Sequence, residues 1–172
     1  MTTDTPRRLV LLRHAKADWP EVPDHERPLA DRGRREAPAA GRWLADQGIL
    51  PDLVLCSTAT RTRETWKLLA PELPHRPPTR YEDRVYEASP GELIALVNQV
   101  EDEARDVLLI GHNPAVHATA DILAGGGDPR ARAGLAGGFP PAALAVLTLD
   151  GGWSGAEPGS ATLTHYWSPR EP

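Results

Sequence analysis

The chain has 172 residues, enough for one domain with a substantial core and too few for two. Apolar residues make up 40% and charged residues 25%, a composition that excludes an intrinsically disordered chain. The net charge of −5 and the sequence pI of about 5.7 argue against a nucleic-acid-binding protein. Residues 1–80 nevertheless carry 14 Lys and Arg against 11 Asp and Glu, so an anion site is expected in that half.

Three further features of the sequence bear on the compartment of the protein and on whether it enters a membrane. Cys56 is the only thiol, which excludes an internal disulfide and a cysteine-based zinc cluster. The longest nearly unbroken apolar stretch, Ala142–Leu149, is far shorter than the ~20 residues needed to span a bilayer. The beginning Met1–Asp4 lacks the basic-then-apolar order of a signal peptide. We therefore expect a cytoplasmic protein with no membrane partner.

Short apolar runs without polar alternation predict strands that are covered on both faces. They are Leu9–Leu12, Leu53–Leu55 and Val107–Ile110. Stretches with helical spacing follow these runs, at Glu36–Leu44, Thr60–Ala70, Pro90–Val100 and Pro114–Leu123. Ser89 is the predicted N-cap of the third helix, and Gly48 the predicted stop of the first.

The C-terminal part predicts two more strands, Ala142–Leu149 and Ala161–Trp167, after a flexible Gly125–Gly138 loop. We expect Pro169–Pro172 to be a frayed tail. The alternation of strands and helices predicts an α/β fold, with one domain over residues 1–172 and its core over about residues 9–167. Its architecture is expected to be a three-layer α/β/α sandwich around a mostly parallel sheet.

Cationic or potentially cationic side chains follow the ends of three predicted strands. The first ends in Arg13-His14, the second is followed by Arg61, and the third by His112. Because ligands of such sheets gather at the carboxyl ends of the strands, we expect these four side chains to converge. They would repel one another unless they bind an anion, and guanidinium groups match a phosphoryl group.

A histidine within such a cluster also has chemical uses. Neutral imidazole attacks phosphorus to give a phosphohistidine, which water then hydrolyses. The two arginines and the second histidine would neutralise charge on the transferred group, so the reaction requires no metal or other cofactor.

Four motifs in order give a resemblance to a known family. The residues are Leu11–Trp19, Arg27–Gly33, Ser57–Thr65 and Gly111–Asn113. They resemble the histidine phosphatase superfamily, which has the phosphoglycerate mutase-like fold, and most closely its SixA branch of bacterial phosphohistidine phosphatases. The resemblance runs from about Leu9 to Trp167.

The resemblance implies a role for each of these four side chains. His14 is the implied nucleophile, Arg13 and Arg61 bind the phosphoryl group, and His112 is a third ligand that neutralises charge. The superfamily's usual Arg-His-Gly motif has Ala15 as its third residue here, a substitution common in this branch.

Members of this superfamily often take a general acid from the stretch after the third strand. Glu82, Asp83 and Glu87 fall there, and Glu87 is our candidate, although an exposed structural carboxylate is an equal alternative. An imidazole leaving group needs little help from an acid.

The sequence thus predicts a metal-independent phosphatase acting on phosphohistidine in proteins. The alternatives are a phosphatase for a small phosphomonoester, such as a sugar, nucleotide or cofactor-precursor phosphate, and a non-catalytic phosphate-binding module. The partner is accordingly a phosphorylated protein or metabolite. We expect no nucleic-acid partner, and we expect a monomer.

Overall fold

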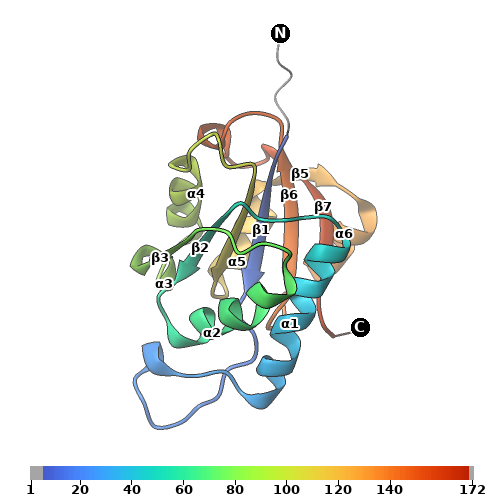
Figure 1. Ribbon diagram of the computed structural model, residues 1–172. Coiled ribbons are helices and arrows are strands. Elements are labelled where there is room, and N and C mark those ends of the chain that lie inside the picture. Colours follow the sequence, from blue (N-terminus) through green and yellow to red (C-terminus); the bar gives the residue numbers. More distant parts are fainter. Residues whose placement is uncertain (1–5, 171–172) are drawn as a thin grey trace.

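Within residues 6–170, the part of the chain that the computed structural model describes, seven strands form one sheet in the order β3-β2-β4-β1-β6-β7-β5 (Figure 1). The strands are β1 Arg7–Arg13, β2 Leu53–Ser57, β3 Thr79–Glu82, β4 Asp106–Gly111, β5 Ala124–Gly127, β6 Leu144–Leu149 and β7 Ala161–Trp167. The α-helices are α1 Asp31–Asp46, α2 Thr60–Leu69, α3 Asp83–Tyr86, α4 Pro90–Asn98, α5 Ala115–Leu123 and α6 Pro129–Gly137. Short 3₁₀ turns are η1 Asp24–Glu26, η2 Ala70–Glu72 and η3 Trp153–Gly155.

The central strand β1 has the buried character that its apolar run predicts. Leu9–Leu12 are all fully buried, and β1 pairs in parallel with β4 and antiparallel with β6. In the described sheet only β6 runs against the other strands, which confirms the mostly parallel prediction. The carboxyl ends of β1, β2 and β4 therefore lie at one edge.

Helices cover both faces of the sheet because successive side chains of β1 point to opposite sides. Leu9 and Leu11 belong to a core that includes side chains of α4, α5 and α6. Val10 and Leu12 belong to a second core with side chains of α1 and α2, including the fully buried Trp66. The three-layer α/β/α architecture is thereby confirmed.

Local signals place several element ends correctly. Ser89 caps α4 in a capping box. Its hydroxyl accepts a hydrogen bond from the Glu92 amide, and the Glu92 carboxylate accepts one from the Ser89 amide. Gly48 follows α1 with a φ of 70°, the conformation expected of a glycine stop. Other boundaries differ: α1, for example, begins at Asp31, and β6 begins at Leu144, since Ala142 has a φ of 66°.

The prediction of a flexible Gly125–Gly138 loop is wrong. The stretch contains β5, which pairs in parallel with β7, and α6, whose N-cap Asp128 accepts the amide of Ala131 at 2.9 Å. Its glycines allow backbones to approach closely: a Cβ on Gly127 would lie 2.2 Å from the carbonyl oxygen of Leu163. The glycines of this stretch therefore allow close packing of the backbone.

The predicted frayed tail is described only as far as Arg170, whose guanidinium lies 3.7 Å from the carboxylate of Glu36. The rest of that tail and the first five residues lie outside the described part. Over residues 6–170, none of the helices combines the length and the apolar character needed to cross a membrane.

Candidate active site

The strand ends that the sequence analysis singled out meet at one edge of the sheet. Arg13 pairs in register with Gly111, and the amide of His14 donates to the Gly111 carbonyl at 3.0 Å. This pairing brings the imidazoles of His14 and His112 to 5.3 Å between ring centroids. Arg61 joins them from the first turn of α2, which begins just after β2. The predicted convergence of four side chains is therefore present.

His14 is buried, with 8% of its surface exposed, and its ring is held in one tautomer. Its Nδ1 lies 2.7 Å from the carbonyl oxygen of Ala15. Because a carbonyl only accepts, Nδ1 carries the proton and Nε2 keeps its lone pair. Burial, with smaller contributions from the nearby His112 and Arg61, lowers the pKa of His14 to about 3. The imidazole is therefore neutral and nucleophilic at neutral pH.

The loop after His14 is fixed by two backbone contacts. The Ala15 amide donates to the hydroxyl of Thr65 on α2 at 3.0 Å, and the Ala30 amide donates to the Lys16 carbonyl at 2.9 Å. Gly33, in the first turn of α1, permits the second approach, because a Cβ there would lie 2.2 Å from that same carbonyl oxygen. Both helices on this face thus hold the loop against the strand edge.

His112, like His14, has a lowered pKa and is neutral at neutral pH. Its Nε2 lies 2.7 Å from the hydroxyl of Ser57, the last residue of β2. Burial, and then the positive charge of Arg61, lower the pKa of His112 to about 4. The resemblance implies a charge-neutralising role, and a phosphoryl anion beside the ring would favour the protonated form that such a role requires.

Several buried polar atoms of these residues have no hydrogen-bond partner among the described residues. They include Nε of Arg13, Nε of Arg61 and Nδ1 of His112. An unsatisfied buried polar group costs about 1–3 kcal/mol, so these atoms are available to pair with a ligand. Two of the three atoms are guanidinium donors, which match the oxygens of a phosphoryl group.

Asp24 is a site residue that the sequence analysis missed. It lies in η1, and its backbone carbonyl and carboxylate accept from Arg61 at 2.8 and 3.1 Å. The carboxylate also accepts from the hydroxyl of Tyr86 and, at 3.0 Å, from Arg27. These hydrogen bonds, first that of Tyr86, hold the pKa of Asp24 well below its ordinary value. Since Asp24 is 37 residues from Arg61 and 62 from Tyr86, no local spacing reveals the contact.

The segment between α6 and β6 contacts two residues at this edge of the sheet. The Phe139 carbonyl accepts from Arg13 at 3.1 Å and from the Asn113 side-chain amide at 2.9 Å. Burial, with the positive charges of Arg170 and Arg61, lowers the pKa of Arg13. The segment that orients Arg13 directly follows the helix that the sequence analysis took for a loop.

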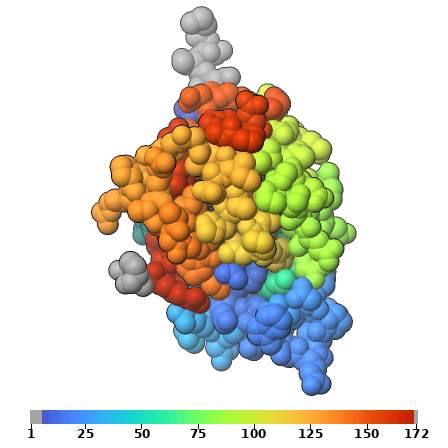
Figure 2. Space-filling model, turned by 180° about the vertical axis from the view of Figure 1, so that it is seen from behind, coloured from blue at the N-terminus to red at the C-terminus, as the bar shows by residue number. Residues whose placement is uncertain are grey.

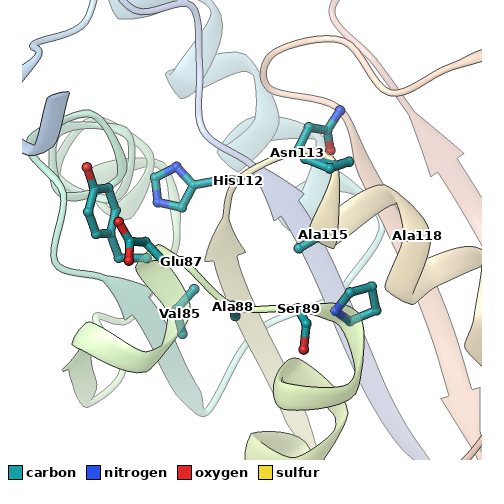
Figure 3. Close-up of a pocket in the computed structure, with 11 residues that line it drawn as sticks. Val85, Glu87, Ala88, Ser89, His112, Asn113, Ala115 and Ala118 are labelled. Carbon is teal, nitrogen blue, oxygen red and sulfur yellow. The ribbon is translucent and has the colours of Figure 1, made fainter.

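The predicted general acid, Glu87, lies beside the site but is exposed. It follows α3 and shares with His112 the lining of a pocket of about 350 Å³ (Figure 3). The alternatives are engaged elsewhere: Asp83 accepts from the Thr58 hydroxyl at 2.7 Å, and Glu82 pairs with Arg84 at 3.1 Å. The geometry thus favours Glu87 over Glu82 as a group that reaches a substrate, and its role as an acid stays a prediction.

Residues 6–170 contain no cluster of three or more His, Cys, Asp or Glu side chains placed to hold a metal ion. The groups that can hold a ligand at this edge are the cationic and neutral nitrogens described above.

Comparisons with known proteins agree with this geometry. Residues 9–109 match the sequence pattern of the histidine phosphatase superfamily (branch 1). An uncharacterised protein of Mycobacterium tuberculosis is 42% identical over 162 residues, which cover 92% of this chain and all of the relative.

Solved structures give the same result. A protein of Nakamurella multipartitia, provisionally named phosphohistidine phosphatase SixA, is 35% identical with a TM-score of 0.85, covering 98% of this chain and 99% of that one. The protein of Agrobacterium tumefaciens with the same provisional name is 33% identical with a TM-score of 0.80, covering 96% and 99%. The chain is therefore a phosphatase of the histidine phosphatase superfamily, branch 1, and is similar to the SixA-type members over the length compared.

Proposed function

We propose that this protein hydrolyses phosphohistidine in other proteins through a phosphoenzyme formed on His14, without a metal ion. Nε2 of His14 attacks the phosphorus atom, a new P–N bond forms, and the P–N bond of the substrate breaks. The departing imidazole of the substrate keeps the bonding electron pair and takes up a proton. Water then attacks the phosphoenzyme, releasing phosphate and restoring neutral His14.

The side chains around His14 supply the charge that this reaction needs. Arg13 and Arg61 bring positive charge and unpartnered buried N–H groups, the donor set that phosphoryl oxygens require. His112 has a low pKa in the free protein, so it takes up a proton when the phosphoryl anion arrives and then neutralises charge. The hydrogen bonds from Arg61 to Asp24 must break when Arg61 binds that anion.

The observation that carries the choice of substrate is the chemistry of the pocket beside His112. Among the described residues that line it, most side chains are apolar, Glu87 brings a carboxylate, and none is Lys or Arg. A leaving group that bears a second phosphate or a carboxylate would find no countercharge there and would face Glu87. An imidazole is neutral, or cationic once protonated, and suits this pocket. Glu87 is placed to supply or stabilise that proton.

A small phosphomonoester is the second candidate, favoured by the volume of the pocket. About 350 Å³ lies within the range of small-molecule sites, so an ester whose alcohol part is uncharged also fits. A non-catalytic binding module is less well supported, because Arg13, His14, Arg61 and His112 all lie together.

The test compares substrates in the presence of EDTA. We expect turnover of p-nitrophenyl phosphate and of a phosphohistidine peptide, a larger kcat/KM for the peptide, and loss of at least about 10³-fold in His14→Ala. A panel with 3-phosphoglycerate and glucose 6-phosphate should show the phosphoglycerate as the poorest substrate. A larger kcat/KM for an ester than for the peptide would favour the small phosphomonoester over phosphohistidine as the substrate. Phosphate binding without turnover would indicate the binding module, and a requirement for metal would overturn the mechanism.

A further inference from the structure

The segment between β1 and α1 exposes apolar side chains next to the candidate active site. Trp19 is 76% exposed and Val22 43%, although burial of such side chains is favourable. The segment projects past the edge where the strands end, below α2 in Figure 1, and stands out in blue at the lower edge of Figure 2. It therefore offers an apolar surface beside the phosphate-binding residues.

The indole of Trp19 is held in place rather than left free. The guanidinium carbon of Arg27 lies 3.3 Å from the ring centroid, a stacked cation–π contact. Arg27 is itself buried, and it donates to the Asp18 carbonyl at 3.0 Å and to Asp24 at 3.0 Å. Because the ring is already ordered, a partner that covers it loses little side-chain entropy.

The same contacts connect Trp19 to the reaction site. Arg27 binds one carboxylate oxygen of Asp24, and Arg61 binds the other at 3.1 Å. Trp19 nevertheless does not line the pocket beside His112. A small molecule that fills this pocket therefore leaves the indole uncovered, whereas a folded partner that places a phosphoryl group on Arg61 extends over the neighbouring segment.

We propose that Trp19 and Val22 are the docking contact for the protein that presents the phosphohistidine, an inference that rests on the proposed function. The partner places an apolar side chain on this pair, since exposed tryptophans are among the residues that dominate binding energy at interfaces. The same segment carries exposed carboxylates at Asp18, Glu21 and Glu26, against one exposed lysine, Lys16. The matching partner surface therefore carries Lys or Arg around its apolar side chain, close to the phosphohistidine.

The experiment uses two synthetic phosphohistidine peptides of equal length. One has Leu and Lys around the phosphohistidine, and the other has Ser and Asn, with p-nitrophenyl phosphate as the reference. For the Leu/Lys peptide, Trp19→Ala should lower kcat/KM at least about tenfold more than it does for the reference, and Val22→Ser about threefold more. Added salt should also lower kcat/KM for the Leu/Lys peptide, because the carboxylates of this segment attract its lysines.

Two further variants separate docking from folding and from general loss of apolar surface. Trp19→Phe keeps a ring over Arg27 and should recover most of the loss for the Leu/Lys peptide. Leu50→Ala removes a 40% exposed side chain at the opposite edge of the sheet, just before β2, and should leave the ratio of the two kcat/KM values unchanged.

The outcomes distinguish the two proposals. If both peptides are hydrolysed equally well and Trp19→Ala lowers kcat/KM by the same factor for every substrate, the docking proposal is wrong and the proposed function stands. If neither peptide is hydrolysed while p-nitrophenyl phosphate is, the proposed function fails and the docking proposal fails with it.

Discussion

Acidification should destabilise this protein chiefly through its two active-site histidines. In the folded chain the pKa of His14 is lowered to about 3 and that of His112 to about 4, mainly by burial. An unfolded histidine has a pKa near 6.5, so below that pH the unfolded state binds more protons than the folded state does. Stability is therefore lost as the pH falls from about 6.5 towards the folded-state pKa values.

The size of the effect follows from the same shifts. Between pH 7 and pH 5 each histidine removes about 2 kcal/mol from the free energy of unfolding, and the pair removes about 4 kcal/mol. A domain of this kind has roughly 5–15 kcal/mol of stability in all, so the loss is readily measured.

The assay is urea denaturation followed by tryptophan fluorescence at pH 7 and pH 5, at constant ionic strength and without phosphate. His14→Asn should lose about 2 kcal/mol less than the wild type between the two pH values, while His75→Asn, at an exposed position, should behave as the wild type does. Added phosphate should reduce the wild-type loss, because an anion beside the two rings raises both pKa values. An equal loss in His14→Asn and the wild type would refute the reasoning.

Two further variants test the ligand-free contacts around the site. Asp24→Asn removes the carboxylate that pairs with Arg61, so inorganic phosphate should inhibit the variant more tightly than the wild type. The expected gain is about 2–5-fold, because the Asp24–Arg61 pair is partly exposed. Weaker inhibition would show that Asp24 helps to bind the anion. Gly33→Ala places a Cβ 2.2 Å from the Lys16 carbonyl oxygen and should cost about 2–3 kcal/mol of stability and lower kcat, as measured by thermal unfolding and phosphatase assays. Wild-type stability and activity in this variant would mean that the loop after the nucleophile shifts freely.

The fold was predictable where burial dictates sequence. A strand covered on both faces must be apolar throughout, which is why the run Leu9–Leu12 predicted a strand buried on both faces. The edge strand β5 follows another rule: its glycines contribute backbone pairing and close approach, and they leave no hydrophobic pattern to detect. The signal for α6 was present, since Asp128-Pro129 is an N-cap followed by a proline, but the surrounding glycines obscured it.

The residues of the site also fall into those that the sequence predicts and one that it does not. Arg13, His14 and His112 follow strands that can be recognised, so topology alone brings them together. Asp24 lies in a segment of loop and 3₁₀ turn, and its position depends on contacts with side chains far away in the chain. Whether a loop carboxylate reaches an arginine on another element is decided by tertiary packing, which one sequence does not display.

The central claim is a covalent intermediate on His14, and the most direct measurement is to trap it. The protein is mixed with a phosphohistidine peptide in EDTA, quenched in alkali within one turnover, and digested for mass spectrometry. We expect one phosphoryl group on the fragment that contains His14, and none in His14→Ala, which should also show no turnover. Rapid turnover by the wild type with no phosphate on His14, or turnover that persists in His14→Ala, would contradict the mechanism.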